Sequence, residues 1–201
     1  MYDQRVENAE ELLGSRYQKS VVRGTEKIQK INGSVYRMTK ASLPKDYKHD
    51  YKKIAQAIID EAHRNSFDPV LLMAMIQSES SFNPRQLGHA GEIGLMQHKP
   101  STAQWMARVS CLHWSGAESL FNPLVNIQLG AAYLNYLRGK FDSHAQLYLA
   151  AYNRGSSRAR GSLEKKIWPK EYPAHVMKHY IAYYRELRDK SRRPATNSTS
   201  L

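Results

Sequence analysis

Glu79 is the residue whose type and position most directly suggest chemistry. The segment 69–80 reads PVLLMAMIQSES, and Glu79 follows Leu72, Met75 and Ile76 at helical spacing. The four side chains therefore share one face of a predicted helix. A carboxyl group that extends an apolar stripe loses hydration, which raises its pKa and lets it act as a general acid near neutral pH. Position alone also allows an ordinary helix-end glutamate bonded to a nearby Lys, Arg or backbone amide.

Several short motifs surround Glu79 and continue along the chain. They are Glu79-Ser80, Phe82, Asn83-Pro84, Gly94-Leu95-Met96-Gln97, Pro100-Ser101-Thr102-Ala103, Asn122-Pro123, Asn126-Ile127, Gly130, Tyr133-Leu134 and Ala151-Tyr152-Asn153-Arg154-Gly155. In this order, over about residues 50–188, they resemble the soluble lytic transglycosylase family, whose domain has a goose-lysozyme-like α fold. Separate motifs in the correct order make the resemblance specific.

The resemblance implies cleavage of the β-1,4 bond between MurNAc and GlcNAc in peptidoglycan. Glu79 would act first as general acid and then as general base, closing a 1,6-anhydro ring on the sugar without water or a second carboxylate. It also implies a substrate groove, whose expected residues are Met96, Gln97, Tyr152, Asn153 and Tyr180. Val176-Met177 stands where the family often has Glu-Thr, so the register of Tyr180 stays open.

Two loop positions depart from the family pattern. Gly88 replaces a serine thought to contact the acetamido sugar, and Glu92 replaces an alanine. Glu92 could position a water and turn the reaction toward lysozyme-type hydrolysis. It could also bind a cationic, deacetylated sugar, which makes it a further candidate substrate-binding residue. The plain alternative is a solvated loop carboxylate.

The elements that must position these residues are predicted to be helices. Apolar periodicity and caps favour helices over 4–20, from about 50, over 69–80, after Pro100, from Pro123 to about 138, from Ser143 to about 155, and from about 174 to 190. No segment shows sustained strand alternation, so the class is mainly α and the domain lysozyme-like. A small β-hairpin in the active-site loop, within 81–98, or within 21–48 stays open.

Composition shifts divide the chain into three parts. Residues 1–48 hold a charged N-terminal helix followed, over 21–48, by a basic linker or wrap. Residues 49–190 are the predicted lysozyme-like catalytic domain. Residues 191–201 form a polar tail that we expect to be disordered.

The net charge of +12 favours polyanions such as nucleic acid, anionic lipid or cell-wall polymers. No nucleic-acid motif is present, so the expected partner is the glycan strand of peptidoglycan rather than nucleic acid. A binding module that kept the fold and lost activity is the other alternative. No apolar run is long enough to span a membrane, and we expect a monomer.

Cysteine and histidine usage argues against disulfides, metals and cofactors. Cys111 is the single cysteine, so no internal disulfide can form, and a buried inert thiol is expected. No Cys/His cluster has zinc spacing. The start of the chain lacks a secretory signal pattern, yet the expected substrate implies a periplasmic or secreted location.

Overall fold

The computed structural model describes residues 4–23, 28–165 and 167–192, and within them it confirms the mainly α class. The α-helices are α1 (Gln4–Leu13), α2 (Ile28–Ser42), α3 (Tyr51–Arg64), α4 (Pro69–Ser80), α5 (Pro100–Val109), α6 (Pro123–Lys140), α7 (Ala145–Arg154), α8 (Ser156–Glu164) and α9 (Glu171–Arg192). Short 3-10 helices are η1 (Gly14–Lys19), η2 (Lys45–Asp50) and η3 (Ala117–Phe121).

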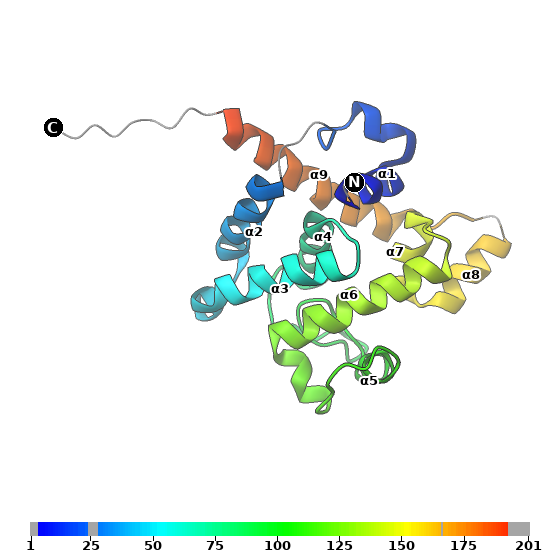
Figure 1. The fold of residues 1–201 in the computed structure, drawn as a ribbon. Helices are drawn as coiled ribbons and strands as arrows, with labels where there is room; N and C mark the ends of the chain where they lie inside the picture. Colours follow the sequence, from blue (N-terminus) through cyan, green and yellow to red (C-terminus); the bar gives the residue numbers. More distant parts are fainter. Residues whose placement is uncertain (1–3, 24–27, 166, 193–201) are drawn as a thin grey trace.

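Helix α4 lies at the centre of the molecule (Figure 1). It begins where Asp68 accepts a hydrogen bond from the Val70 N–H at 2.9 Å and Pro69 occupies the first helical position. Every residue from 69 to 76 is buried, so the helix is apolar on all sides, as a core helix must be. It packs against α9, α3 and α2.

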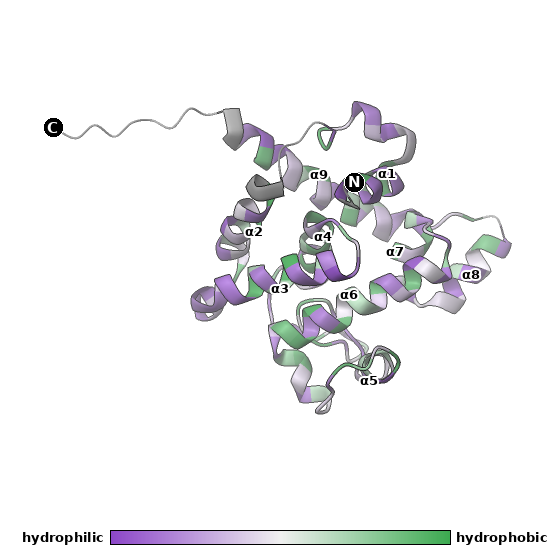
Figure 2. Cartoon of the chain, in the orientation of Figure 1, coloured by the Kyte–Doolittle hydropathy of each residue, from purple (hydrophilic) through white to green (hydrophobic). Residues whose placement is uncertain are grey.

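Helix α6 repeats the same start signal and forms the other main support. The Asn122 side chain accepts from the Leu124 N–H at 3.0 Å, and Pro123 follows it. The helix packs against α3, α7 and α5, and a second, smaller apolar cluster fills the space between α5, η3 and α6. Hydrophilic and hydrophobic residues alternate along α3 and α6 (Figure 2), as expected of helices with one face in solvent.

The N-terminal residues pack in the same core as the predicted catalytic domain. Residues 28–42, expected within a linker or wrap, form α2, because Ile31, Val35 and Met38 make an apolar stripe at helical spacing. The surrounding Lys, Ser and Gly residues conceal that stripe in the composition. Helix α1 is tied to the core by Glu11, whose carboxylate accepts from Arg138 Nε at 2.8 Å.

Several smaller expectations have different outcomes. Helix α8 was not predicted from the sequence. In place of the hairpin considered for 81–98, the structure has isolated antiparallel bridges from Ile93 to Leu87 and from Ile93 to His98. Cys111 is exposed, not buried, because it follows the end of α5 in a left-handed turn. The tail predicted for 191–201 lies outside the described residues from 193 onward. Among the described helices, none is both long and apolar enough to cross a bilayer.

Candidate active site

Glu79 lies in the last turn of α4, at the point where the chain leaves the core. The helix ends because Ser81 and Phe82 adopt left-handed backbone angles, with φ of 51° and 62°. The Ser80 hydroxyl donates to the Leu95 carbonyl at 2.8 Å and thereby joins the helix end to the following loop. The half-buried Glu79 side chain is thus held between a rigid core helix and that loop.

The surroundings of Glu79 favour its protonated form. Burial, with a smaller contribution from the nearby Glu92 carboxylate, raises the pKa of its carboxyl from 4.5 to about 7. The hydroxyl of Tyr172, in the first turn of α9, donates a hydrogen bond to Glu79 Oε1 and acts in the opposite direction. The net result is a carboxyl group that can release and recover a proton near neutral pH.

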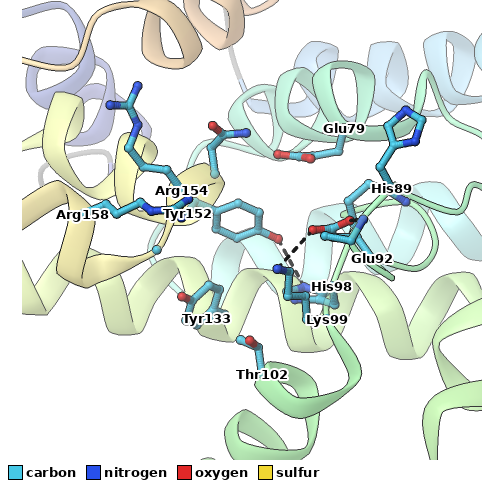
Figure 3. Close-up of a pocket in the computed structure, with 14 residues that line it drawn as sticks. Glu79, His89, Glu92, His98, Lys99, Thr102, Tyr133, Tyr152, Arg154 and Arg158 are labelled. Carbon is cyan, nitrogen blue, oxygen red and sulfur yellow. Dashed lines mark hydrogen bonds and ion pairs between the residues drawn. The ribbon is translucent and has the colours of Figure 1, made fainter.

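The Glu79 carboxyl faces a pocket of about 510 Å³. In Figure 3 the Glu79 side chain enters it from one side, and Tyr133 and Thr102 line the side away from Glu79. Of the predicted site residues, Glu79, Glu92, Gln97, Tyr152 and Asn153 meet there. The other lining residues are His89, Ala90, His98, Lys99, Thr102, Tyr133, Arg154, Gly155 and Arg158.

Asn126 of α6 holds the loop that follows Glu79. Its buried side-chain amide donates to the carbonyls of Ile93 and Leu120 at 2.8 and 2.9 Å, and its oxygen accepts from the Met96 N–H at 2.7 Å. Gly94 has φ +80°, and a Cβ there would lie 2.5 Å from the Leu120 carbonyl oxygen. The Gly-Leu-Met-Gln motif is therefore a backbone requirement as well as a source of side chains.

Met96 and Gln97 have different positions in this loop. The Met96 side chain is fully buried beside Gly130, and Met96 does not line the pocket. Its backbone carbonyl contributes indirectly, by accepting a hydrogen bond from the Tyr152 hydroxyl. The Gln97 amide donates to the carbonyls of Gln86 and Gly94 at 3.1 and 3.0 Å. Those two bonds use only the amide nitrogen of Gln97 and hold the side chain at the pocket wall, so the amide oxygen can accept a hydrogen bond from a ligand.

The hydroxyl of Tyr152 is held by two groups. Its hydroxyl donates to the Met96 carbonyl at 3.0 Å and lies 3.2 Å from His98 Nε2. Burial lowers the pKa of His98 to about 4, so the imidazole is neutral at physiological pH. With its single proton directed at Met96, the Tyr152 hydroxyl accepts from His98 Nε2–H. This network leaves the Tyr152 ring as the surface presented to a ligand.

Glu92 and Gly88, the two departures from the family pattern, are in contact. A Cβ at Gly88 would overlap Glu92 Oε2 and would lie 2.8 Å from Gln97 Oε1. Glu92 Oε2 accepts from the Ala90 N–H at 3.0 Å, and Oε1 lies 3.5 Å from Lys99 Nζ. Partial burial raises the pKa of the Glu92 carboxyl. The backbone amides of Glu92 and Ala90 and the Lys99 ammonium act in the opposite direction, and the net effect is a lowered pKa. The Glu92 carboxylate thus occupies the space of a side chain at position 88.

This contact gives a stability prediction. We expect Gly88→Ser to lower the free energy of unfolding by about 0.5–1.5 kcal/mol, because the new side chain must displace Glu92 from its hydrogen bond with the Ala90 N–H. The double variant Gly88→Ser with Glu92→Ala should recover most of that loss. Urea unfolding of the four proteins of this cycle measures the coupling. Additive effects of the two substitutions would show that the side chains do not compete for the same space.

The cations of the pocket are largely uncompensated. Lys99 pairs with Glu92, whereas Arg154 and Arg158 have no carboxylate partner among the residues that the structure describes. In Figure 3, Arg154 and Arg158 lie on the same side of the pocket as Tyr152. Over the same described residues, no group of three or more His, Cys, Asp or Glu side chains is placed to hold a metal ion.

The tyrosine that bonds to Glu79 is neither of the two, Tyr152 and Tyr180, that the sequence suggested for the groove. Tyr180 is fully buried outside the pocket, and its hydroxyl donates to Asp68 Oδ2 at 2.6 Å. Tyr172, two helical turns earlier on α9, bonds to Glu79 instead. The altered residues Val176-Met177 signalled an uncertain register. Of the other lining residues, Lys99 and Arg158 belong to none of the sequence motifs, and Tyr133 lies in the Tyr133-Leu134 motif but was not predicted to line the groove.

A family model described as the transglycosylase SLT domain matches residues 56–174. Membrane-bound lytic murein transglycosylase C of Histophilus somni is 38% identical in an alignment of 104 positions, which covers 47% of this chain and 29% of that protein. This chain thus spans less than a third of that relative. The match bears out the resemblance seen in the motifs.

Solved structures show the same fold. An inactive mutant of the lytic transglycosylase Slt from Pseudomonas aeruginosa superposes with a TM-score of 0.62 at 27% identity, covering 66% of this chain and 24% of that one. The 70 kDa soluble lytic transglycosylase of Escherichia coli gives 0.60 at 20% identity, covering 83% and 31%. The lysozyme-like α fold is therefore confirmed. With its family model, motifs and fold in agreement, this chain belongs to the transglycosylase SLT family.

Proposed function

We propose that this chain cleaves the β-1,4 bond between MurNAc and GlcNAc in peptidoglycan, with Glu79 as the catalytic acid and base. The observation that carries the proposal is a carboxyl group with a pKa of about 7 on the wall of a 510 Å³ pocket. Family membership supports the reaction class. The inactive P. aeruginosa structure is described as a Glu-to-Gln mutant, which agrees with one essential glutamate in that relative.

The chemistry needs one group that can exchange a proton in both directions. Protonated Glu79 donates to the bridging oxygen as the bond to the sugar C1 breaks, and positive charge develops at that carbon. The Glu79 carboxylate then accepts the proton of the sugar's own 6-hydroxyl, whose oxygen bonds to C1. The products are a free 4-hydroxyl on one fragment and a 1,6-anhydro end on the other, and Glu79 is protonated again.

The rest of the pocket suits a glycan substrate. Tyr152 and Tyr133 offer ring faces for sugar C–H groups, and Asn153 and the Gln97 oxygen offer hydrogen bonds to hydroxyl or acetamido groups. The guanidinium groups of Arg154 and Arg158, which have no carboxylate partner among the described residues, suit the carboxylates that peptidoglycan carries on its peptides. In this proposal the chain acts as a monomer in the periplasm or outside the cell, where its substrate is found.

A second candidate function is hydrolysis, favoured by the position of Glu92. Its carboxylate lines the same pocket as Glu79, raises the pKa of Glu79 and occupies the space of a side chain at position 88. It could hold a water that attacks C1 in place of the 6-hydroxyl. A preference for deacetylated sugar is less favoured, because Glu92 is already paired with Lys99.

A digest of purified peptidoglycan, native and deacetylated, tests both functions. Mass spectrometry of the fragments should find 1,6-anhydro ends in the wild-type digest and none with the Glu79→Gln variant. Reducing MurNAc ends that disappear in Glu92→Ala would support the hydrolytic function. An intact, folded protein that binds peptidoglycan but releases no fragments would overturn the enzymatic proposal in favour of a binding module.

Tyr172 provides a prediction on pH dependence. Its hydrogen bond lowers the pKa of Glu79, so removing it in Tyr172→Phe should raise that pKa and move the alkaline limb of kcat/KM to higher pH. The profile would be measured on soluble glycan strands. Tyr183→Phe is the matched control, since Tyr183 on the same helix bonds at 3.2 Å to Gln77, outside the pocket. A limb that stays in place or moves down would contradict this role of Tyr172.

A further inference from the structure

An aromatic strip leads out of the catalytic pocket along α6 and reaches α5. Its first member, Tyr133, lines the pocket and lies 5.4 Å from Tyr152 between ring centroids. Tyr136 stacks on Tyr133 at 6.4 Å with an interplanar angle of 13°. Trp105 meets Tyr136 edge to face at 4.8 Å. These contacts connect three rings to the pocket wall in one series.

The strip follows from helix geometry on both sides. On α6, Tyr136 comes one turn after Tyr133, and on α5, Trp105 comes one turn after Thr102, which also lines the pocket. In Figure 3, Tyr133 and Thr102 lie together on the side of the pocket away from Glu79. Each helix therefore presents an aromatic ring one turn beyond its pocket residue, and the two rings touch.

The outer rings remain accessible. Tyr136 is 38% exposed although it packs against Tyr133 and Trp105. Trp105 is partly exposed and lines a second pocket of 580 Å³ with Trp114, Gln104 and Arg108. That pocket thus combines two indole rings with an amide and a guanidinium group.

We propose that Tyr136 and Trp105 form an outer subsite that binds further sugar rings of the glycan strand whose scissile bond lies at Glu79. We assign a glycan to this subsite because Tyr133 contacts both Tyr136 and the catalytic-pocket residue Tyr152, so one strand can extend from the pocket onto the outer rings. A pyranose has an apolar C–H face that stacks on an aromatic ring and hydroxyl groups at its edge. Gln104 and Arg108 can donate hydrogen bonds to those hydroxyl groups.

The charge around the strip also fits a strand that carries acidic peptides. Lys140 Nζ lies 5.5 Å from the centroid of the Tyr136 ring and donates to the Ser156 hydroxyl at 3.2 Å. With Arg108 on the other side, cations border the strip and no described acidic residue lines the second pocket. A glycan strand with carboxylates on its peptides therefore meets no described acidic side chain in the second pocket.

The subsite rests on the proposed function, and its test uses binding in the inert Glu79→Gln background. Soluble glycan strands of graded length are titrated by calorimetry. Trp105→Ala and Tyr136→Ala should each weaken the binding of long strands about tenfold, the order expected for one lost stacking platform. Binding of a short fragment that fills only the catalytic pocket should stay the same. Trp105→Phe and Tyr136→Phe, which keep a ring, should retain most of the affinity.

Kinetics in the otherwise unaltered protein give the second readout. The alanine variants should raise KM for long strands with little change in kcat, because the rings lie away from the reacting bond. Trp168→Ala is the matched control, since Trp168 is 44% exposed and lines neither of these two pockets. Melting temperatures identify any variant that fails to fold, and the phenylalanine variants then decide.

Three outcomes would overturn the subsite. They are equal losses for long and short glycans, no loss in either alanine variant, or the same loss in Trp168→Ala. Short glycans that are bound and cleaved normally while the alanine variants behave as wild type would remove the subsite alone. A protein that neither binds nor cleaves any glycan would remove the proposed function and the subsite together.

Discussion

Glu79→Gln is expected to lower the rate of glycan cleavage by about 10²–10⁴-fold. The amide has nearly the same shape as the protonated acid and can still accept the Tyr172 hydrogen bond, but it cannot transfer a proton to the bridging oxygen. Binding of glycan strands should therefore persist. Release of soluble fragments from purified peptidoglycan measures the loss, and Glu118→Gln, an exposed glutamate of η3, serves as the control.

The same substitution should stabilise the fold at alkaline pH. The pKa of Glu79 is about 7 in the folded protein, against an ordinary value of 4.5. Between those values the folded state keeps a proton that the unfolded chain has lost, so stability falls as pH rises through this window. Above pH 7 the cost is on the order of 3 kcal/mol, and the neutral amide avoids it.

Thermal unfolding across pH checks this expectation. Glu79→Gln should unfold at a higher temperature than the wild type at pH 8 and at nearly the same temperature at pH 4. A gain at pH 8 together with lost activity is the pattern of a group kept for catalysis at the expense of stability. If the variant and the wild type unfolded at the same temperature at pH 8 as well as at pH 4, the raised pKa of Glu79 would be contradicted.

Asp68→Ala is expected to destabilise the protein by about 3–5 kcal/mol. Asp68 is fully buried, caps α4 through the Val70 N–H, and accepts hydrogen bonds from the hydroxyls of Tyr180 and Tyr184 on α9. Its removal uncaps the central helix and leaves two buried hydroxyls without their acceptor. In a chain of 201 residues this loss corresponds to a fall in Tm of roughly 10 °C.

Circular dichroism melts of a small variant set measure this effect. Tyr180→Phe and Tyr184→Phe should each cost about 1 kcal/mol, because Asp68 keeps its other donors. Asp46→Ala, at an exposed position in η2, should have little effect. Tyr180→Phe should also leave kcat/KM unchanged, since its side chain lies outside the pocket. A Tm for Asp68→Ala close to that of Asp46→Ala would contradict the structural role of Asp68.

The described helices that the sequence predicted well have local signals. Asp68-Pro69 and Asn122-Pro123 are caps followed by proline, and both helices begin there in the structure. Helix α2 was missed because its apolar stripe lies among Lys, Ser and Gly residues and becomes helical by packing against α3 and α4.

The residues of the candidate site also divide into those that lie in local sequence motifs and those that are placed by packing between distant segments. Glu79, Gln97 and Tyr152 lie in local motifs, and the structure brings them to one pocket. Tyr172 reaches Glu79 from 93 residues away, and that approach depends on how α9 packs against α4. Tyr180, expected in the groove, is turned into the core because its hydroxyl bonds to the buried Asp68. No local pattern contains either contact.

From the sequence alone, the helical class, the central helix and the family of motifs around Glu79 could be determined, since each depends on residues close together in the chain. Only the tertiary structure decided which tyrosine serves Glu79 and that Gly88 leaves room for Glu92. It also decided that α1 and α2 belong to the main core. These outcomes depend on side chains from distant segments competing for the same buried space, which a linear pattern does not record.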